Sequence, residues 1–301
     1  MPDLRSSRLQ KAVWGPTSTK VRQNTWLRGP AASSYRLFAR MMPPGAPPKI
    51  LANSIPKSGT HLLTKVLSGV PHLRFTGVHL ADRAYCADLN QLGDALGPVD
   101  VEAFAKLIGH TRNGQYLTAH IRHVPGIPEA LRDQGFHNLF MIRDPRDLVV
   151  SMAYWLSTNP RLKAYERFSK MSGPEERIMA AITGLPAHNG KPAVMSISHR
   201  LAFRGWLDDP QTCVIRFEDL IGPSGGGTEE AQRDAIRRVL AHSNRDTSDE
   251  LVDRLAASTF ARHTTTFRRG AIGDWQNHLT PEHLAAIDEV APGILEIYGY
   301  A

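Results

Sequence analysis

From residue 49 onward, short apolar runs of β type alternate with patterns typical of helices. The four expected strands are residues 49–55, 115–121, 137–142 and 212–217. The expected helices are residues 61–67 and 147–156, and three largely helical stretches, residues 229–242, 248–257 and 281–298, close the chain. Such alternation is typical of βαβ units. We therefore expect an α/β fold: one domain in which helices flank a central parallel sheet.

The positive charge of the chain is concentrated at one end. The formal net charge is +7 at pH 7, and residues 1–48 hold eight basic side chains against one acid, Asp3. Residues 49–301 carry 28 basic and 28 acidic side chains and are therefore neutral. A proline-rich stretch at residues 43–48 marks a boundary. This divides the chain into a basic N-terminal arm, residues 1–48, and a domain, residues 49–301.

The basic arm has three interpretations that the sequence leaves open. It wraps the core or stays partly disordered, or its residues 35–42 form an interfacial helix that binds an anionic lipid surface. The third interpretation is a transit peptide, because the arm is rich in arginine and serine and poor in acids. No nucleic-acid-binding motif accompanies it, so we expect no nucleic-acid partner.

The composition points to a protein of the cytoplasm, with peripheral membrane contact through the arm as one interpretation. The most apolar stretch, residues 148–156, is far shorter than the roughly 20 residues that cross a bilayer. The two cysteines, Cys86 and Cys213, have no metal-ligand spacing. We expect both to be buried thiols in a reducing compartment, and we expect no metal site.

The first expected strand is followed at once by a motif suited to binding an anion. Its sequence is Ile55-Pro56-Lys57-Ser58-Gly59-Thr60-His61-Leu62. Hydroxyls, a flexible glycine, a lysine charge and the N–H groups of a helix that starts near His61 all favour a phosphate or sulfate. It is not a Walker A loop, because the lysine precedes the glycine. Taken alone, the motif is equally compatible with a helix that is merely capped after a turn.

Two further cationic segments follow at a distance in the chain. Arg143 stands at the end of the third expected strand, and Ser151 lies eight residues later on the helix that follows. Near the C-terminus, Arg268 and Arg269 precede Gly270 in a glycine-rich loop, where adjacent guanidinium groups can bind one phosphate. Three anion-binding signals in a neutral domain indicate one ligand with two or three anionic groups.

Together these segments resemble the cytosolic-type sulfotransferases, whose sulfuryl donor is 3′-phosphoadenosine 5′-phosphosulfate. The resemblance covers about 250 residues, from Lys49 to near the C-terminus. The matching segments are Lys57-Ser58-Gly59-Thr60 for the 5′-phosphosulfate loop, Arg143 and Ser151 for the 3′-phosphate pair, Phe217-Glu218-Asp219-Leu220 for the YEDL segment, and Arg268-Arg269-Gly270 with Gly273-Asp274-Trp275 for the C-terminal RKGxxGDW segment. The resemblance implies a donor site that also includes His61 and Leu62, and chemistry without a metal.

The resemblance also implies a catalytic base. The family places a histidine at a strand end within Lys-Thr-His-Leu-Pro, and here the matching stretch holds Thr118, His120 and Arg122. His120 is thus the expected general base, and Lys57 the group that neutralises the leaving oxygen. The sequence departs from the family at Thr118 and Arg122, and also at Leu62, which replaces an aromatic that stacks on adenine. Adenine stacking is then expected on Phe217 or Phe260.

The expected function is transfer of a sulfuryl group from the donor to a hydroxyl or amine by in-line displacement. A different class also fits the same residues: a non-catalytic binder of sulfated or phosphorylated ligands. The acceptor is a small molecule, a glycan or a lipid, because the expected acceptor pocket, residues 75–85, 154–155 and 157–208, holds several aromatic side chains. The sequence specifies neither the acceptor nor the oligomeric state.

Overall fold

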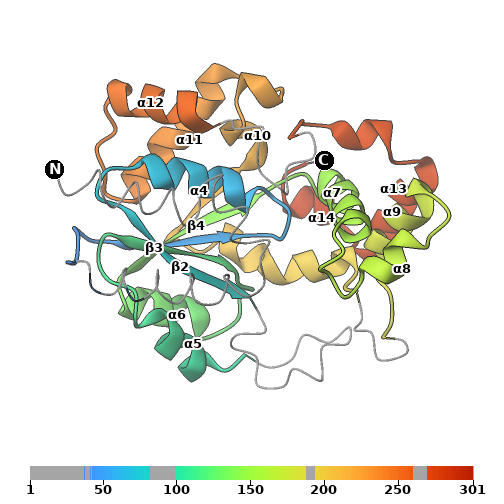
Figure 1. Ribbon diagram of the computed structural model, residues 1–301, viewed down its shortest axis with the longest axis horizontal. Coiled ribbons are helices and arrows are strands. Elements are labelled where there is room, and N and C mark those ends of the chain that lie inside the picture. Colours follow the sequence, from blue (N-terminus) through green and yellow to red (C-terminus); the bar gives the residue numbers. More distant parts are fainter. Residues whose placement is uncertain are drawn as a thin grey trace.

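A parallel sheet forms the centre of the molecule (Figure 1). Its five strands are paired in the order β2-β3-β1-β4-β5. The computed structural model describes residues 43–81, 99–187, 194–259 and 270–300, together with Leu37 and Met41. The strands are β1 (Lys49–Ser54), β2 (Arg74–Ala81), β3 (Gln115–His120), β4 (Phe136–Ile142) and β5 (Thr212–Arg216). The predicted α/β fold with a central parallel sheet is thus confirmed.

Helices connect the strands and cover the sheet. They are α4 (Thr60–Gly69), α5 (Val101–Ile108), α6 (Ile127–Asp133), α7 (Pro145–Thr158), α8 (Tyr165–Ser169), α9 (Pro174–Thr183), α10 (Phe217–Leu220), α11 (Glu229–His242), α12 (Asp249–Thr259), α13 (Pro281–Val290) and α14 (Ile294–Ile297). The described residues also form the 3-10 helices η2 (Ile197–Leu207), η3 (Pro223–Gly225) and η4 (Asp274–Asn277). The stretch 281–298 is largely helical, as predicted, and Pro292 and Gly293, the latter at φ 70°, divide it into α13 and α14.

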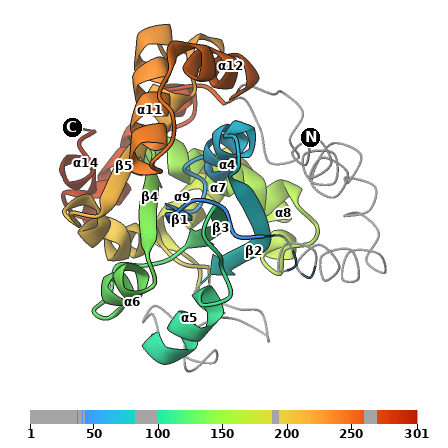
Figure 2. The same cartoon turned by 90° about the vertical axis from the view of Figure 1, so that its left-hand side faces the viewer.

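The sheet separates two hydrophobic cores. Side chains of a strand alternate between its faces, so Ile50 and Ala52 of β1 join one core whereas Leu51 joins the other. The first core lies beneath α4, α11 and α12, and the second lies on the opposite face, where α5 and α6 pack (Figures 1 and 2). Because both faces are buried, the central strands read as continuous apolar runs.

Strand β2, at the edge of the sheet, was not predicted from the sequence. Its residues are half polar and include Gly77 at φ 78°, where the register between β2 and β3 shifts. An apolar pattern therefore does not mark this strand. The described part of the stretch 157–208 holds α8, α9 and η2, with one isolated bridge between Leu185 and Val194.

The surface and the arm are described only in part. Most of the basic arm, residues 1–36, 38–40 and 42, lies outside the described residues, as does Cys86.

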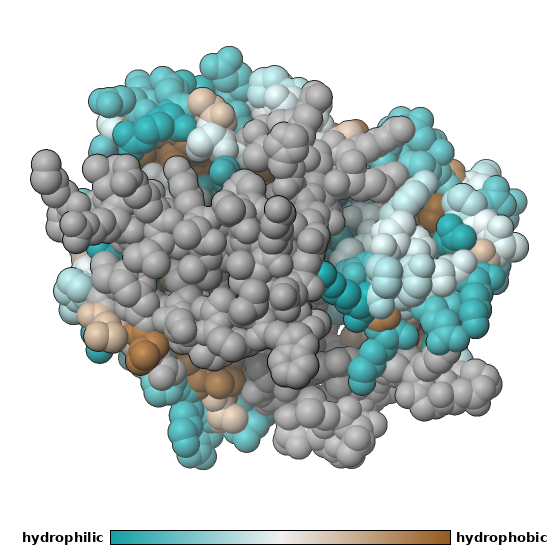
Figure 3. All heavy atoms as spheres, in the orientation of Figure 1, coloured by the Kyte–Doolittle hydropathy of each residue, from teal (hydrophilic) through white to brown (hydrophobic). Residues whose placement is uncertain are grey.

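Cys213 is half-buried on β5 and carries a free thiol, and burial raises its pKa. On the face in Figure 3 the described residues are mostly hydrophilic, with small hydrophobic areas. None of the helices in the described ranges has the length and apolar character needed to span a membrane.

Candidate functional site

Three central strands end at the same edge of the sheet, and each is followed by a residue singled out from the sequence. β1 leads into the loop with Lys57, β3 ends in His120, and β4 leads into Arg143. β1 pairs with β3 on one side and with β4 on the other. Ligands of open parallel sheets bind at such carboxyl ends, next to the point where the strand order reverses.

The loop between β1 and α4 has the backbone of an anion cradle. Lys57 has φ 75° and Gly59 has φ 107°, both in the left-handed region. A Cβ at position 59 would lie 2.7 Å from Cδ2 of Phe217, so the position also needs glycine for space. Ser58 is fully buried, and its hydroxyl bonds to the carbonyls of Ile55 at 2.7 Å and Met141 at 2.8 Å. Ser58 therefore fixes the loop on β4 rather than offering its hydroxyl to a ligand.

The N-terminus of α4 lies at this loop and carries no competing acidic group. Its N-cap, Gly59, provides no side-chain cap, and its first turn holds no acidic residue. The first N–H groups of a helix lack intrahelical partners and attract anions. His61 is exposed, whereas Leu62 is buried in the core beneath α4. The described structure thus gives Leu62 a packing role.

Arg143 forms the second part of the site. It is 9% exposed, and its Nη2 donates to the carboxylate of Asp147 at 3.2 Å and to the carbonyl of Ala271 at 2.9 Å. Its guanidinium stacks 4.2 Å above the ring centroid of Phe217. The Nε of Arg143 is buried without a hydrogen-bond partner among the described residues. A buried, unpaired N–H next to a cationic loop fits a phosphate oxygen.

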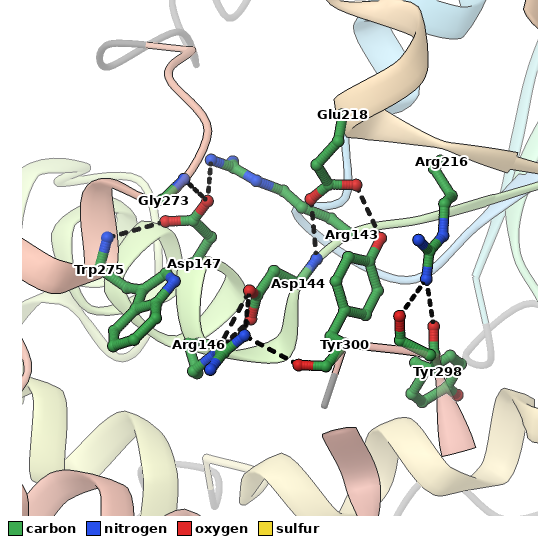
Figure 4. Close-up of polar contacts among 11 residues, drawn as sticks. Arg143, Asp144, Arg146, Asp147, Arg216, Glu218, Gly273, Trp275, Tyr298 and Tyr300 are labelled. Atoms are coloured by element: carbon green, nitrogen blue, oxygen red, sulfur yellow. Dashed lines mark hydrogen bonds and ion pairs between the residues drawn. The ribbon is translucent and has the colours of Figure 1, made fainter. Parts of the chain in front are cut away.

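A polar clasp holds Arg143 and the C-terminal segment together (Figure 4). Asp147, 2% exposed, accepts hydrogen bonds from the backbone N–H of Gly273 at 3.1 Å and of Trp275 at 2.9 Å, besides the one from Arg143. Glu218 accepts from the N–H of Asp144 at 3.0 Å and from the Tyr300 hydroxyl at 2.7 Å. These contacts bring the C-terminal segment to the end of β4.

The same clasp continues through Arg146. Its guanidinium pairs with Asp144 at 2.8 Å, donates to the carbonyl of Tyr300 at 2.9 Å and lies 4.2 Å from the Trp275 ring centroid. Arg216 likewise donates to the carbonyl of Tyr298 at 3.0 Å. Burial raises the pKa of Glu218, and burial together with the Glu218 carboxylate raises that of Tyr300 far above its usual range. The Tyr300 hydroxyl therefore keeps its proton near neutral pH and remains a hydrogen-bond donor to Glu218.

His120 forms the third part of the site. Its Nδ1 lies 2.8 Å from the carbonyl of Ser54, at the end of β1. A carbonyl only accepts, so Nδ1 carries the proton and Nε2 keeps its lone pair. The Ser54 hydroxyl lies 3.1 Å from the same Nδ1 and 2.6 Å from the hydroxyl of Thr60, the first residue of α4. A chain of contacts thus joins the anion cradle to the imidazole.

The electrostatics of the site keep one group neutral and make another readily titratable. Desolvation first, and the neighbouring His79 imidazole second, lower the pKa of His120 to about 3. Burial, and then the charge of Arg143, lower the pKa of Lys57 to about 8. The Lys57 Nζ lies 4.9 Å from the ring centroid of Trp155 on α7. Near pH 7 the site therefore holds a neutral imidazole and a charged ammonium group.

The structure brings most of the predicted site residues together at one edge of the sheet. Lys57, Gly59, Thr60, His120, Arg143 and Phe217 gather there through the contacts described above, and Ala271, the residue after Gly270, accepts a hydrogen bond from Arg143. Arg268, Arg269 and Phe260 lie outside the described residues. Ser151 is half-buried on α7, and no hydrogen bond joins it to Lys57 in the described part of the chain.

Three residues that contribute to the site were missed from the sequence. Ser54 and His79 contact the ring of His120, and Asp147 holds Arg143. Asp147 carried a signal, because an acid four residues after an arginine on a helix commonly pairs with it. Ser54 and His79 carried none, since their roles depend on strands that are neighbours only in the folded sheet.

Comparisons with known proteins agree with this geometry. A family model for the sulfotransferase domain matches residues 47–292. Sulfotransferase 6B1 of Danio rerio is 24% identical over 165 residues, which are 50% of this chain and 49% of that protein. Cytosolic sulfotransferase 17 of Arabidopsis thaliana is 26% identical over 185 residues, 55% of this chain and 52% of that protein. The matched segments thus span about half the length of these curated relatives.

A solved structure shares the fold. The crystal structure of mouse sulfotransferase SULT7A1 complexed with PAP superposes with a TM-score of 0.52 and 19% identity, and covers 90% of this chain and 95% of that chain. At this identity the likeness concerns the fold alone.

Proposed function

Because the chain belongs to the sulfotransferase domain family, we propose that it transfers a sulfuryl group from 3′-phosphoadenosine 5′-phosphosulfate to a hydroxyl or amine of an acceptor. One observation carries the mechanism: the Nδ1 of His120 donates to the Ser54 carbonyl at 2.8 Å. This bond fixes the tautomer with a free lone pair on Nε2, as a general base requires.

Two cationic regions are the proposed donor site. The loop with Lys57 and Gly59, together with the N-terminus of α4, would hold the 5′-phosphosulfate end, and Arg143 would hold the 3′-phosphate. The unpaired, buried Nε of Arg143 supports this, because it is a donor that lacks an acceptor in the described structure. Phe217 already packs one face on Arg143, so an adenine could stack only on its other face, or on Phe260.

The donor, when bound, supplies the sulfuryl group; the chain's own residues position the reactants and manage charge. Lys57 neutralises the negative charge that develops on the leaving oxygen. His120 accepts the acceptor's proton on Nε2 as the new S–O or S–N bond forms and the bond to the leaving phosphate breaks. The Ser54 carbonyl, which accepts from Nδ1, stabilises the imidazolium that results. Such general base catalysis contributes roughly 10²–10⁴-fold.

Transfer of radiolabelled sulfate tests this function. We expect His120→Ala to lose about 10²-fold or more in rate while its affinity for adenosine 3′,5′-bisphosphate stays at the wild-type level. His110→Ala is the matched control, because His110 is an exposed residue beyond α5. Full activity of His120→Ala would show that the base is another group. Tight bisphosphate binding without any turnover in the wild type would instead support the non-catalytic binder.

The second part of the proposal concerns the chemical class of the acceptor. The basic arm favours a lipid or glycolipid acceptor at a membrane surface, because eight cations face one acid in residues 1–48. Vesicles that contain anionic phospholipid should bind the full chain more tightly than a chain that starts at Lys49. Equal binding of the two chains would remove this argument and leave phenols, sterols and sugars as the candidates.

A further inference from the structure

The strand next to His120 is irregular and carries a second imidazole, that of His79. Between Phe75 and His79 the register of β2 against β3 shifts, so that four residues of β2 advance along two residues of β3. Gly77, at φ 78°, lies within this irregularity. An unshifted register would place His79 opposite His120, whereas the shift places it opposite Thr118, two residues earlier on β3. Bulges of this kind next to active sites often redirect a side chain.

His79 is anchored where the bulge places it. Its Nδ1 lies 3.0 Å from the hydroxyl of Thr118. Thr118 also lies 3.4 Å from the carbonyl of Val78, which only accepts. That carbonyl favours donation by the threonine hydroxyl and therefore acceptance from the Nδ1–H of His79. Thr118 and His120 are two residues apart on β3, so they share one face of the sheet.

The two imidazoles touch edge to face. The ring centroids of His79 and His120 are 4.8 Å apart at an interplanar angle of 80°. On the other side of β3, the Ser54 carbonyl of β1 binds Nδ1 of His120. The ring of His120 is thus restrained from both neighbouring strands, by a hydrogen bond from one and by a ring contact from the other.

We propose that His79 is a positioning residue for His120: its imidazole, anchored on Thr118, fixes the orientation of the His120 ring. This inference rests on the proposed function, in which His120 is the base. His79 itself need not contact the donor or the reacting atoms. Thr118, which departs from the family pattern, thereby acquires a role as the anchor of a second histidine.

The charges around His120 agree with this role. The groups that face it are the Ser54 carbonyl of β1, which favours its protonated form, and His79 of β2, Arg200 of η2 and His61 of α4, which disfavour it. Among the charged neighbours His79 has the largest effect on the pKa of His120. His79→Phe keeps a ring packed on His120 and removes the imidazole, so it should move the titration of His120 to higher pH, whereas a packing role alone would leave the titration unchanged in this variant.

The test compares His79→Gln, His79→Phe and Thr118→Val with the control His110→Gln. The probes are benzyl alcohol, which needs a base to remove its proton, and 4-nitrophenol at mildly alkaline pH, where it is already ionised. We expect His79→Gln to lower kcat for the alcohol about tenfold, with little change for the phenolate and none in adenosine 3′,5′-bisphosphate affinity. Thr118→Val, which leaves both rings in place, should show a smaller loss in the same direction.

A second readout needs no acceptor. In protein labelled with [13C]imidazole, the titration midpoint of His120 should move to higher pH in His79→Gln and His79→Phe but not in His110→Gln. Wild-type titration and wild-type kcat for the alcohol in all His79 variants would overturn the inference while His120→Ala still loses activity. Full activity of His120→Ala would instead overturn the proposed function itself, so the two failures are distinguishable.

Discussion

Asp147→Asn is the substitution whose effect the structure specifies most closely. One carboxylate oxygen accepts from Arg143 at 3.2 Å and from the Gly273 N–H at 3.1 Å, and the other accepts from the Trp275 N–H at 2.9 Å. An asparagine can keep the bond to Trp275 with its oxygen. Its NH₂ group then faces two donors, Gly273 and Arg143, and both bonds are lost.

The expected loss follows from the burial of this pair. A hydrogen bond to a charged group contributes about 1.5–3 kcal/mol, so two lost bonds cost about 3 kcal/mol or more. This agrees with the roughly 3–5 kcal/mol for a broken buried ion pair, since the side chains of Arg143 and Asp147 are only 11% and 1% exposed. A destabilisation of about 3 kcal/mol corresponds to a fall in Tm of roughly 6–12 °C.

The assay is thermal unfolding with and without adenosine 3′,5′-bisphosphate. We expect the variant to lose bisphosphate affinity as well, because Arg143 is no longer held against the end of β4. Asp234→Asn is the matched control: it breaks the pair with Arg237, whose side chains are 37% and 62% exposed, and should cost less than about 1 kcal/mol. If both variants melt alike and bind the bisphosphate as the wild type does, the clasp does not hold the site.

Three further predictions follow from the same residues. Gly59→Ala forces a Cβ to 2.7 Å from Phe217 at φ 107°, so urea unfolding should show a free energy of unfolding lower by about 1–3 kcal/mol. Calorimetry should show a weaker affinity for the bisphosphate. Unchanged values of both would mean that the loop relaxes. The pKa of Lys57, about 8, predicts that bisphosphate affinity falls as pH rises from about 7 to about 9, because the ammonium group loses its charge. Lys57→Arg should abolish this pH dependence. A parallel decline of affinity in both proteins would contradict the prediction. The folded-state pKa of His120, about 3, lies below its unfolded value near 6.5, so the unfolded chain binds a proton that the folded chain does not. The free energy of unfolding therefore falls as the pH drops from about 6.5 to about 3. Denaturant unfolding at several pH values should show this decline, and His120→Asn should flatten it.

The sequence predicted the parts of the fold that depend on local pattern. β1, β3 and β4 are buried strands, β5 is half-buried around Ile215, and the ends of all four were predicted within one residue of those observed. β2 was not predicted because polar residues and Gly77 interrupt its apolar pattern at the sheet edge. The C-terminal stretch 281–298 was predicted as largely helical, whereas its division at Pro292 and Gly293 was not predicted.

The candidate site, like the fold, could be predicted from the sequence only in part. Lys57, Arg143 and His120 could be predicted to converge because each follows or ends a parallel strand, and such ends share one edge of the sheet. The partners that hold them could not. Ser54 contacts a residue 66 positions away, and Asp147 contacts one 128 positions away; neither spacing leaves a periodic trace in the sequence. The buried role of the Ser58 hydroxyl was hidden for the same reason, since its partner Met141 lies on another strand.

The most direct test of the central claim is a crystal structure of the full chain with adenosine 3′,5′-bisphosphate. We expect the 5′-phosphate in the loop of Lys57 and Gly59, the 3′-phosphate on the Nε of Arg143, and His120 facing the place where a sulfuryl group would leave. A nucleotide bound elsewhere, or one that touches the Lys57 loop while Arg143 remains unpaired, would contradict the account.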